Sequence, residues 1–379
     1  MTYPPGPHYG APQQEPVGGQ SQWWETPDQR GGPGSWEPQQ QWAAAPPPPP
    51  PRGGKTKWIL ASLATIAVIM LTAIVTVVAV RSDHGEVGNG APEGSGPELA
   101  SANDTGPITI ITDEPTCGAW SKVSDEYYQI AVSVKFDDRD PAIPQSSWTA
   151  GQRDMYETIK KALTHQVEQT TKLVPQTPHR AVRVLYQQFI AYAQTYIDRL
   201  PSYVDDDDNL VRASNAASTA VGHLCSAITR RSAQAVAPLT TAVDQPTNTH
   251  EEEGSSSPTK MITKSGSVCS EWNQASKKFD AAAESWRAID NKIPAKDWTP
   301  EQKSIEEAIG PVMATYADEL ERLGRQSANA SLEDIATLAA VYRRAFVAVI
   351  PTYISNDAYL QLTAVQLARM VNAACKSPS

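Results

Sequence analysis

Two carboxylates and a histidine on one predicted helix have the spacing of metal ligands. His165 and Glu168 form an H-x-x-E pattern, and Glu157 lies about two helical turns earlier. Helical bundles build metal sites from such residues when facing helices supply further ligands. The second half of the chain has Thr315 and Asp318 at the matching positions, so the pattern is not repeated. We therefore predict no metal site and no cofactor here.

A run of four aspartates, Asp205–Asp208, resembles a cation-binding loop. It lacks the glycine and the distal glutamate that a calcium loop requires. The matching residues of the second half, 355–358, read Ser-Asn-Asp-Ala. Because the run follows Pro201, it fits an acidic first turn at the positive end of a helix dipole. The sequence favours this helix-start role over calcium binding.

The four cysteines, Cys117, Cys225, Cys269 and Cys375, have the clearest chemistry. No C-x-x-C pair occurs, so the spacing does not indicate a zinc site or a redox-active dithiol. Four cysteines permit three pairings. We predict the bonds Cys117–Cys225 and Cys269–Cys375, and the main alternative joins Cys225 to Cys269.

The chain carries no catalytic signature that we can identify. It has no P-loop, no G-x-G-x-x-G after a strand and no G-x-S-x-G. The 379 residues contain 32 Lys+Arg against 42 Asp+Glu, a formal net charge of −10, which argues against nucleic acid as a partner. We predict a protein that is not an enzyme.

An internal duplication explains where the cysteines lie. Each C-x-x-W motif, at 117–120 and 269–272, opens a segment of about 110 residues that ends in a second cysteine. From Ile143 onward the matching positions are 150 residues apart without a gap. Matching pairs are Ile143 with Ile293, Trp148 with Trp298, Gln152 with Gln302, Tyr192 with Tyr342, Tyr203 with Tyr353, and Cys225 with Cys375.

Apolar residues in both segments recur every three to four positions, which is typical of amphipathic helices. We predict four helices in each unit. Those of the first lie at about 117–137, 149–173, 178–200 and 205–230, and those of the second at about 269–290, 299–324, 331–350 and 355–376. Thr149 with Gln152, and Thr299 with Gln302, indicate capping boxes, and Ser331 marks the start of another helix.

The predicted fold class is all-α, with two tandem four-helix bundles that each carry a disulfide. In an up-down-up-down bundle the start of the first helix and the end of the fourth lie at the same end, where each cysteine pair falls. Trp120 and Trp272, one turn from a cysteine, are predicted to pack over the bridges. The matched Tyr203 and Tyr353 could line a groove, but a core or helix-corner role is favoured.

Residues 57–81 are predicted to form a transmembrane helix. The stretch Trp58–Val80 has no charged residue and, at about 1.5 Å per residue, spans a hydrocarbon core of about 30 Å. Arg52, Lys55 and Lys57 precede it, whereas Arg81 is the one basic residue close behind it. The positive-inside rule predicts a cytoplasmic N-terminus and places the disulfides in an oxidising compartment outside the plasma membrane.

The remaining segments have compositions typical of disorder or of linkers. Residues 1–56 form a Pro/Gly/Gln-rich tail, residues 82–114 a flexible stalk, and residues 231–266 a linker that allows the two units, 115–230 and 267–379, to reorient. The run Pro46–Pro51 should sample polyproline II and can dock to a cytoplasmic protein.

A Pro/Gly/Gln-rich cytoplasmic tail, one signal-anchor helix and a low-complexity stalk resemble the architecture of single-pass envelope proteins of mycobacteria and related actinobacteria. The resemblance covers residues 1–115. We predict a membrane scaffold or interaction protein whose residues 115–379 bind an envelope protein, lipid or wall component. One alternative is a sensor or transport accessory that binds a lipid or small apolar ligand, and a weaker one is an envelope hydrolase.

Overall fold

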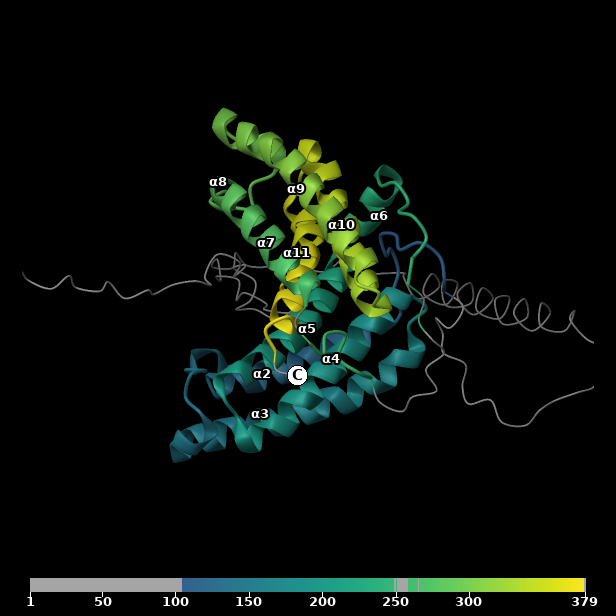
Figure 1. The fold of residues 1–379 in the computed structure, drawn as a ribbon. Coiled ribbons are helices and arrows are strands. Elements are labelled where there is room, and N and C mark those ends of the chain that lie inside the picture. Colours follow the sequence, from purple (N-terminus) through teal and green to yellow (C-terminus); the bar gives the residue numbers. More distant parts are fainter. Residues whose placement is uncertain (1–103, 249, 251–257, 265, 378–379) are drawn as a thin grey trace, which may run out of the picture. The chain divides into compact units, whose positions relative to one another are not determined.

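The computed structural model describes residues 104–248, 250, 258–264 and 266–377 (Figure 1). Within these residues every regular element is a helix, which confirms the all-α prediction. The predicted tail, the membrane helix at 57–81 and the stalk up to residue 103 lie outside the described residues.

The first helical unit contains four long helices, as predicted. They are α2 (Cys117–Ser133), α3 (Ala150–Leu173), α4 (Arg180–Arg199) and α5 (Asp208–Thr229). Helix α2 ends before its predicted boundary because Lys135 adopts a left-handed conformation, with φ of 54°, and a short 3-10 turn, Phe136–Asp138, follows.

The second helical unit has the corresponding helices and an additional short one. They are α7 (Ser267–Ala282), α8 (Glu284–Arg287), α9 (Pro300–Gln326), α10 (Ala330–Val349) and α11 (Ala358–Ala374). Figure 1 shows α2–α5 grouped together and α7–α11 grouped beside them. A further short helix, α6 (Ser232–Val236), lies in the predicted linker and was not anticipated.

Local hydrogen bonds explain where several helices begin. Thr149 and Gln152 form a reciprocal capping box at the start of α3, and Thr299 and Gln302 do the same for α9. The prediction that Ser331 opens the next helix is wrong. The side chain of Asn329 accepts the hydrogen bond from the Leu332 amide at 2.9 Å, so α10 begins at Ala330.

The two units pack against each other instead of reorienting on a free linker. Helices α5 and α11 share the most extensive helix–helix contact among the described residues. His223 near the end of α5 contacts Tyr359 near the start of α11, with ring centroids 5.9 Å apart, so the two helices run antiparallel. Residues 104–377, where described, belong to one compact body.

Two extended arms cross between the units. The arm that precedes the second unit, 258–264, lies on the first: Gln188 on α4 donates to the Thr259 carbonyl, and the Ile262 amide donates to the Tyr192 hydroxyl. The arm that precedes the first unit, 104–116, reaches the second, where the Ile111 backbone lies at the hydroxyl of Tyr342 on α10. Each unit therefore binds the arm of the other.

The first arm corrects the prediction of a flexible stalk up to residue 114. Ile110 and Ile111 belong to the hydrophobic core, and Glu114 is buried. The carboxylate of Glu114 accepts hydrogen bonds from the hydroxyls of Thr116 at 2.7 Å and Thr177 at 2.6 Å. Composition alone did not distinguish this docked segment from the residues before it.

The segment Ala330–Thr352, which includes α10, is the one helix of the described residues that is long and apolar enough to span a membrane. However, 72% of its most apolar window is buried inside the body, where α10 packs against α9 and α11. Central core helices share this length and composition, so the helix is weak evidence for a membrane span.

Candidate functional site

The structure joins Cys117 to Cys225 and Cys269 to Cys375, the pairing that the duplication favours. Both bonds connect the start of a unit to its last long helix, at sequence separations of 108 and 106. Trp120 and Trp272 are fully buried one turn further on. The Trp120 ring packs against Tyr186 and Phe189 of α4, which indicates a core role.

The residues considered as metal ligands do not converge. His165 lies 3.9 Å from the carboxylate of Glu126 on α2 and 3.2 Å from the side-chain amide of Gln169. Glu157 does not join this group, because it forms an ion pair with Lys161. Across the described residues, no group of three or more His, Cys, Asp or Glu side chains is placed to hold a metal ion.

The four aspartates have separate roles. Asp205 and Asp206 are exposed, whereas Asp207 and Asp208 are buried. The Asp207 carboxylate accepts a hydrogen bond from the Val204 amide at 3.0 Å and so closes a 3-10 turn before α5. Asp208 forms an ion pair with Arg139, a partner that the sequence analysis missed.

The same turn recurs in both units between the third and fourth long helices. We call residues 200–207 and 350–357 the end turns. In the first, the Tyr203 carbonyl accepts from the Gln145 amide at 3.0 Å, and in the second the Tyr353 carbonyl accepts from the Ala295 amide at 2.8 Å. Asp357 accepts from the Ile354 amide at 3.0 Å, as Asp207 does from Val204.

The two matched tyrosines hold these turns to the body. The Tyr203 hydroxyl donates to the Pro141 carbonyl at 3.0 Å, and the Tyr353 hydroxyl donates to the Asn291 carbonyl. Both rings are buried, so neither lines an open groove. This agrees with the favoured helix-corner role.

Each end turn presents one exposed apolar side chain. Val204 is 47% exposed and Ile354 is 52% exposed, at positions 150 residues apart. The other large apolar side chains of comparable exposure in the described residues are Val132 at 51% and Leu239 at 59%, which are not a matched pair. Exposed apolar side chains on a rigid turn can make contact with a partner surface.

Buried ion pairs hold together the packed helices that carry the end turns. Arg180 at the start of α4 donates through Nε to both carboxylate oxygens of Asp334 on α10, at 3.2 and 3.0 Å. Their side chains are 6% and 2% exposed, respectively. His250 of the linker contacts the same carboxylate at 2.8 Å. One buried ion pair thus joins the first unit, the second unit and the linker.

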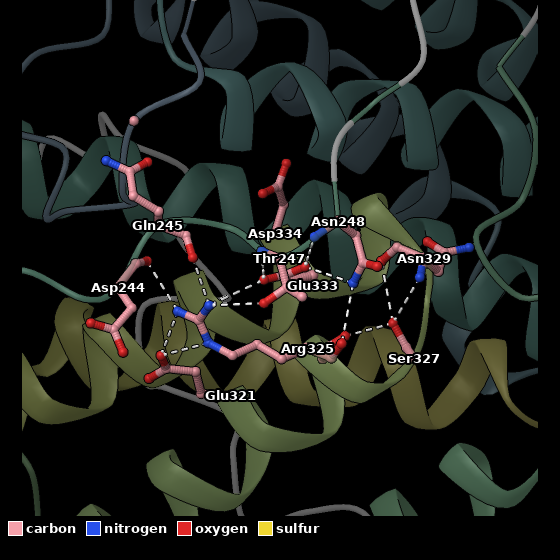
Figure 2. Close-up of polar contacts among 12 residues, drawn as sticks. Asp244, Gln245, Thr247, Asn248, Glu321, Arg325, Ser327, Asn329, Glu333 and Asp334 are labelled. Atoms are coloured by element: carbon pink, nitrogen blue, oxygen red, sulfur yellow. Dashed lines mark hydrogen bonds and ion pairs between the residues drawn. The ribbon is translucent and has the colours of Figure 1, made fainter.

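Beside this pair, Glu333 holds the linker to the second unit (Figure 2). Its carboxylate accepts from the backbone amides of Thr247 and Asn248, both at 2.7 Å. Arg325 donates to the carbonyls of Asp244 and Gln245 at 3.0 and 2.7 Å. We call Arg180, Asp334, Arg325 and Glu333 the junction clasp.

The junction clasp is closed. The hollow that its four residues line with Ile108 and Thr337 has no space for a water-sized molecule. Gly324 allows the close approach of α9 and α10 there, because an added Cβ would lie 2.6 Å from Cβ of Ala336. The clasp is therefore a structural lock and not a ligand pocket.

One buried carboxyl group of the second unit, that of Glu306, has a raised pKa. Glu306 on α9 is 6% exposed and accepts a hydrogen bond from Trp286 Nε1 at 2.9 Å. Burial raises the pKa of Glu306 to about 7, and the hydrogen bond from Trp286 opposes this rise. The first unit has Tyr156 at the matching position, where its ring stacks on Trp148 at 3.8 Å.

Comparison with protein families identifies the helical part of the chain. Residues 99–379 match the family described as "Mycobacterial ESX-1 associated protein". The chain belongs to this family. The match includes both helical units, the arms and the linker, and so covers the entire described body.

A full-length relative supports the assignment. The chain is 37% identical over 391 residues to an uncharacterized protein of Mycolicibacterium smegmatis (strain MKD8), covering 100% of this chain and 97% of the relative. No solved structure matches the chain. The resemblance to mycobacterial proteins is confirmed, whereas the single-pass envelope architecture stays a prediction.

Proposed function

We propose that the chain is a non-enzymatic interaction protein of the cell envelope that acts with components of the ESX-1 secretion system. The family description supports the secretion context. The observation that carries the proposal is the pair of end turns, which expose Val204 and Ile354 at equivalent places on one locked body. Two equivalent contact points on one body favour bivalent binding, which raises avidity without adding new kinds of contact.

The proposal includes membrane anchoring by Trp58–Val80, with the N-terminal tail in the cytoplasm and the disulfide-bonded body outside. The charge difference across this segment and the requirement of the disulfides for an oxidising compartment both favour this orientation. The partner is then an extracytoplasmic envelope component, and the Pro-rich tail is free to bind a cytoplasmic protein.

Co-purification with variants of the end turns tests the proposal. The full-length tagged chain is recovered from membranes of cells that express the secretion system, as wild type and as Val204→Asp, Ile354→Asp and the double variant. We expect each single variant to retain part of the co-purified ESX-1 component, and the double variant to retain less than about a tenth, because avidity is lost.

Val132→Asp is the matched control, since Val132 is equally exposed but is not part of an end turn. It should recover the partner like the wild type. Equal recovery by the double variant and the wild type, or an equal loss in Val132→Asp, would contradict the proposal. Turnover of a wall substrate by the wild-type chain would favour the hydrolase hypothesis instead.

A further inference from the structure

The second unit contains a fully buried arginine that has no carboxylate partner among the described residues. Arg343 lies in the middle of α10 and is 1% exposed. Its guanidinium carbon lies 4.6 Å from the ring centre of Phe279 and 5.1 Å from that of Tyr316. Its Nη1 donates to Oε1 of Gln361 on α11 at 3.0 Å.

Two N–H groups at this place have no acceptor among the described residues. They are Nε of Arg343 and Nε2 of Gln361, and Gln361 is itself only 4% exposed. The hydrogen bond from Arg343 Nη1 to Gln361 Oε1 joins the guanidinium and the amide group that carry these two unused donors. A buried donor without an acceptor destabilises the folded state, and an uncompensated buried charge destabilises it more.

The surroundings do not neutralise the guanidinium. No carboxylate of the described residues forms an ion pair with Arg343. Asp280 has a coulombic effect on the pKa of Arg343, but its carboxylate forms an ion pair with Arg287 and its side chain is 60% exposed. The pKa of Arg343 is lowered to about 10, mainly by burial and to a smaller extent by Arg287, while Tyr316 and Asp280 oppose this fall. The aromatic faces offset part of this cost by cation–π attraction.

The first unit has no such arrangement at the matching positions, where Ala193 and Val211 stand. The first unit has two largely buried arginines, and each has a carboxylate partner: Arg139 is paired with Asp208, and Arg180 is paired with Asp334. Among the described residues, a buried arginine without a carboxylate partner is therefore specific to the second unit, and it is not explained by the shared framework of the two units.

We propose that the second unit binds a compact monovalent anion, of the size of chloride, through Nε of Arg343 and Nε2 of Gln361. Both unused groups are donors, so they fit an anion and not a cation. Because both side chains are almost completely buried, the ligand must be small and easily desolvated, which excludes large polyanions. The anion supplies the negative charge that Asp208 supplies in the first unit. This inference does not rest on the proposed function.

Thermal unfolding of the full chain in detergent tests the anion site. Chloride is raised from 1 to 100 mM by replacing gluconate at constant ionic strength and pH, and the unfolding is followed by circular dichroism. We expect Tm of the wild type to rise by about 3 °C and to saturate, as binding to the folded state requires. Arg343→Met and Gln361→Leu should lose most of this rise.

Arg322→Met is the control, because Arg322 is a partly exposed arginine of the same unit that has carboxylate partners, Glu271 and Glu319. It should keep the full response to chloride. A wild-type Tm that does not depend on the chloride concentration would overturn the proposal. An undiminished rise in Tm for Gln361→Leu would also overturn it. Gln361→Leu keeps the charge of Arg343, so it tests the site even if Arg343→Met does not fold. Bromide-soaked crystals add a direct readout, since an anomalous peak beside Arg343 is expected and its absence would contradict the site.

Discussion

The two helical units have the same end turns, capping boxes and disulfide positions, but they treat buried charge differently. In the first unit, Arg139 lies 3.9 Å above the Phe136 ring and is neutralised by Asp208. In the second, Arg343 also contacts aromatic rings but has no carboxylate partner within the part of the chain that the structure describes, and Glu306 is buried near Tyr353. The shared contacts determine the helix arrangement that the two units have in common, whereas the buried charged residues differ between the two cores.

Removing the carboxylate partner of Arg139 should have the largest effect on stability. It gives the first unit an arginine without a carboxylate partner, as the second unit has. Asp208→Ala leaves a buried guanidinium without its carboxylate, and we expect the free energy of unfolding to fall by about 3–5 kcal/mol. Urea unfolding of the full chain in detergent measures this. A loss below about 1 kcal/mol would mean that the ion pair does not distinguish the units.

The disulfides test whether the two units are stabilised to the same extent by their shared features. Their sequence separations of 108 and 106 are nearly equal, so replacing either pair by serine should cost about 2–5 kcal/mol. The paired variants Cys117→Ser/Cys225→Ser and Cys269→Ser/Cys375→Ser are compared by the same unfolding experiment. We expect the two losses to agree within about 1 kcal/mol, and a much larger loss in one unit would contradict equivalent roles.

These contacts also show how far the sequence is informative. The duplication predicts the disulfide pairing, because each of the two matched segments begins and ends with a cysteine. The repeated Thr-x-x-Gln pattern predicts two helix starts, because a capping box depends on short-range geometry. Arg139 and Asp208, and Arg180 and Asp334, are pairs separated by many residues. Nothing in the local pattern of either partner indicates the other, so these pairs could not be predicted.

The docked arms were missed for a related reason. Residues 104–114 have the polar and Gly/Pro-containing composition of a linker, and only Ile108, Ile110 and Ile111 differ from it. Their burial depends on contacts with helices that come together only after the units have folded and paired. Packing of α5 on α11 likewise follows from faces that each unit leaves uncovered.

Glu306 predicts a pH dependence that is specific to the second unit. Its folded-state pKa of about 7 lies above the value of 4.5 expected in the unfolded chain, so the folded state holds the proton more tightly. The free energy of unfolding should therefore fall as pH rises from about 4.5 to about 7 and become level above that, by about 3 kcal/mol in total.

Glu306→Gln isolates this contribution, because glutamine keeps the shape and does not titrate. Unfolding of the variant and the wild type is compared at pH 4.5, 6 and 8. We expect the variant to gain about 3 kcal/mol relative to the wild type between pH 4.5 and pH 8. A constant difference across the three pH values would show that Glu306 ionises normally.

The smallest effect is expected from removing the unpaired arginine at low chloride. At 1 mM chloride, Arg343→Met should change the free energy of unfolding by less than about 1 kcal/mol, since a buried uncompensated charge is replaced by an apolar chain. The same urea experiment measures it. A loss comparable to that of Asp208→Ala would show that Arg343 has an internal counter-charge, which would remove the difference between the units.

The central claim, that both end turns contact one envelope partner, is tested most directly by photo-crosslinking in living cells. A photoreactive amino acid is placed at position 204, at 354 or at the control position 132 of the full-length chain. The account predicts adducts to the same ESX-1 component from 204 and 354 and none from 132. No adduct from either end turn, or a stronger one from 132, would contradict it.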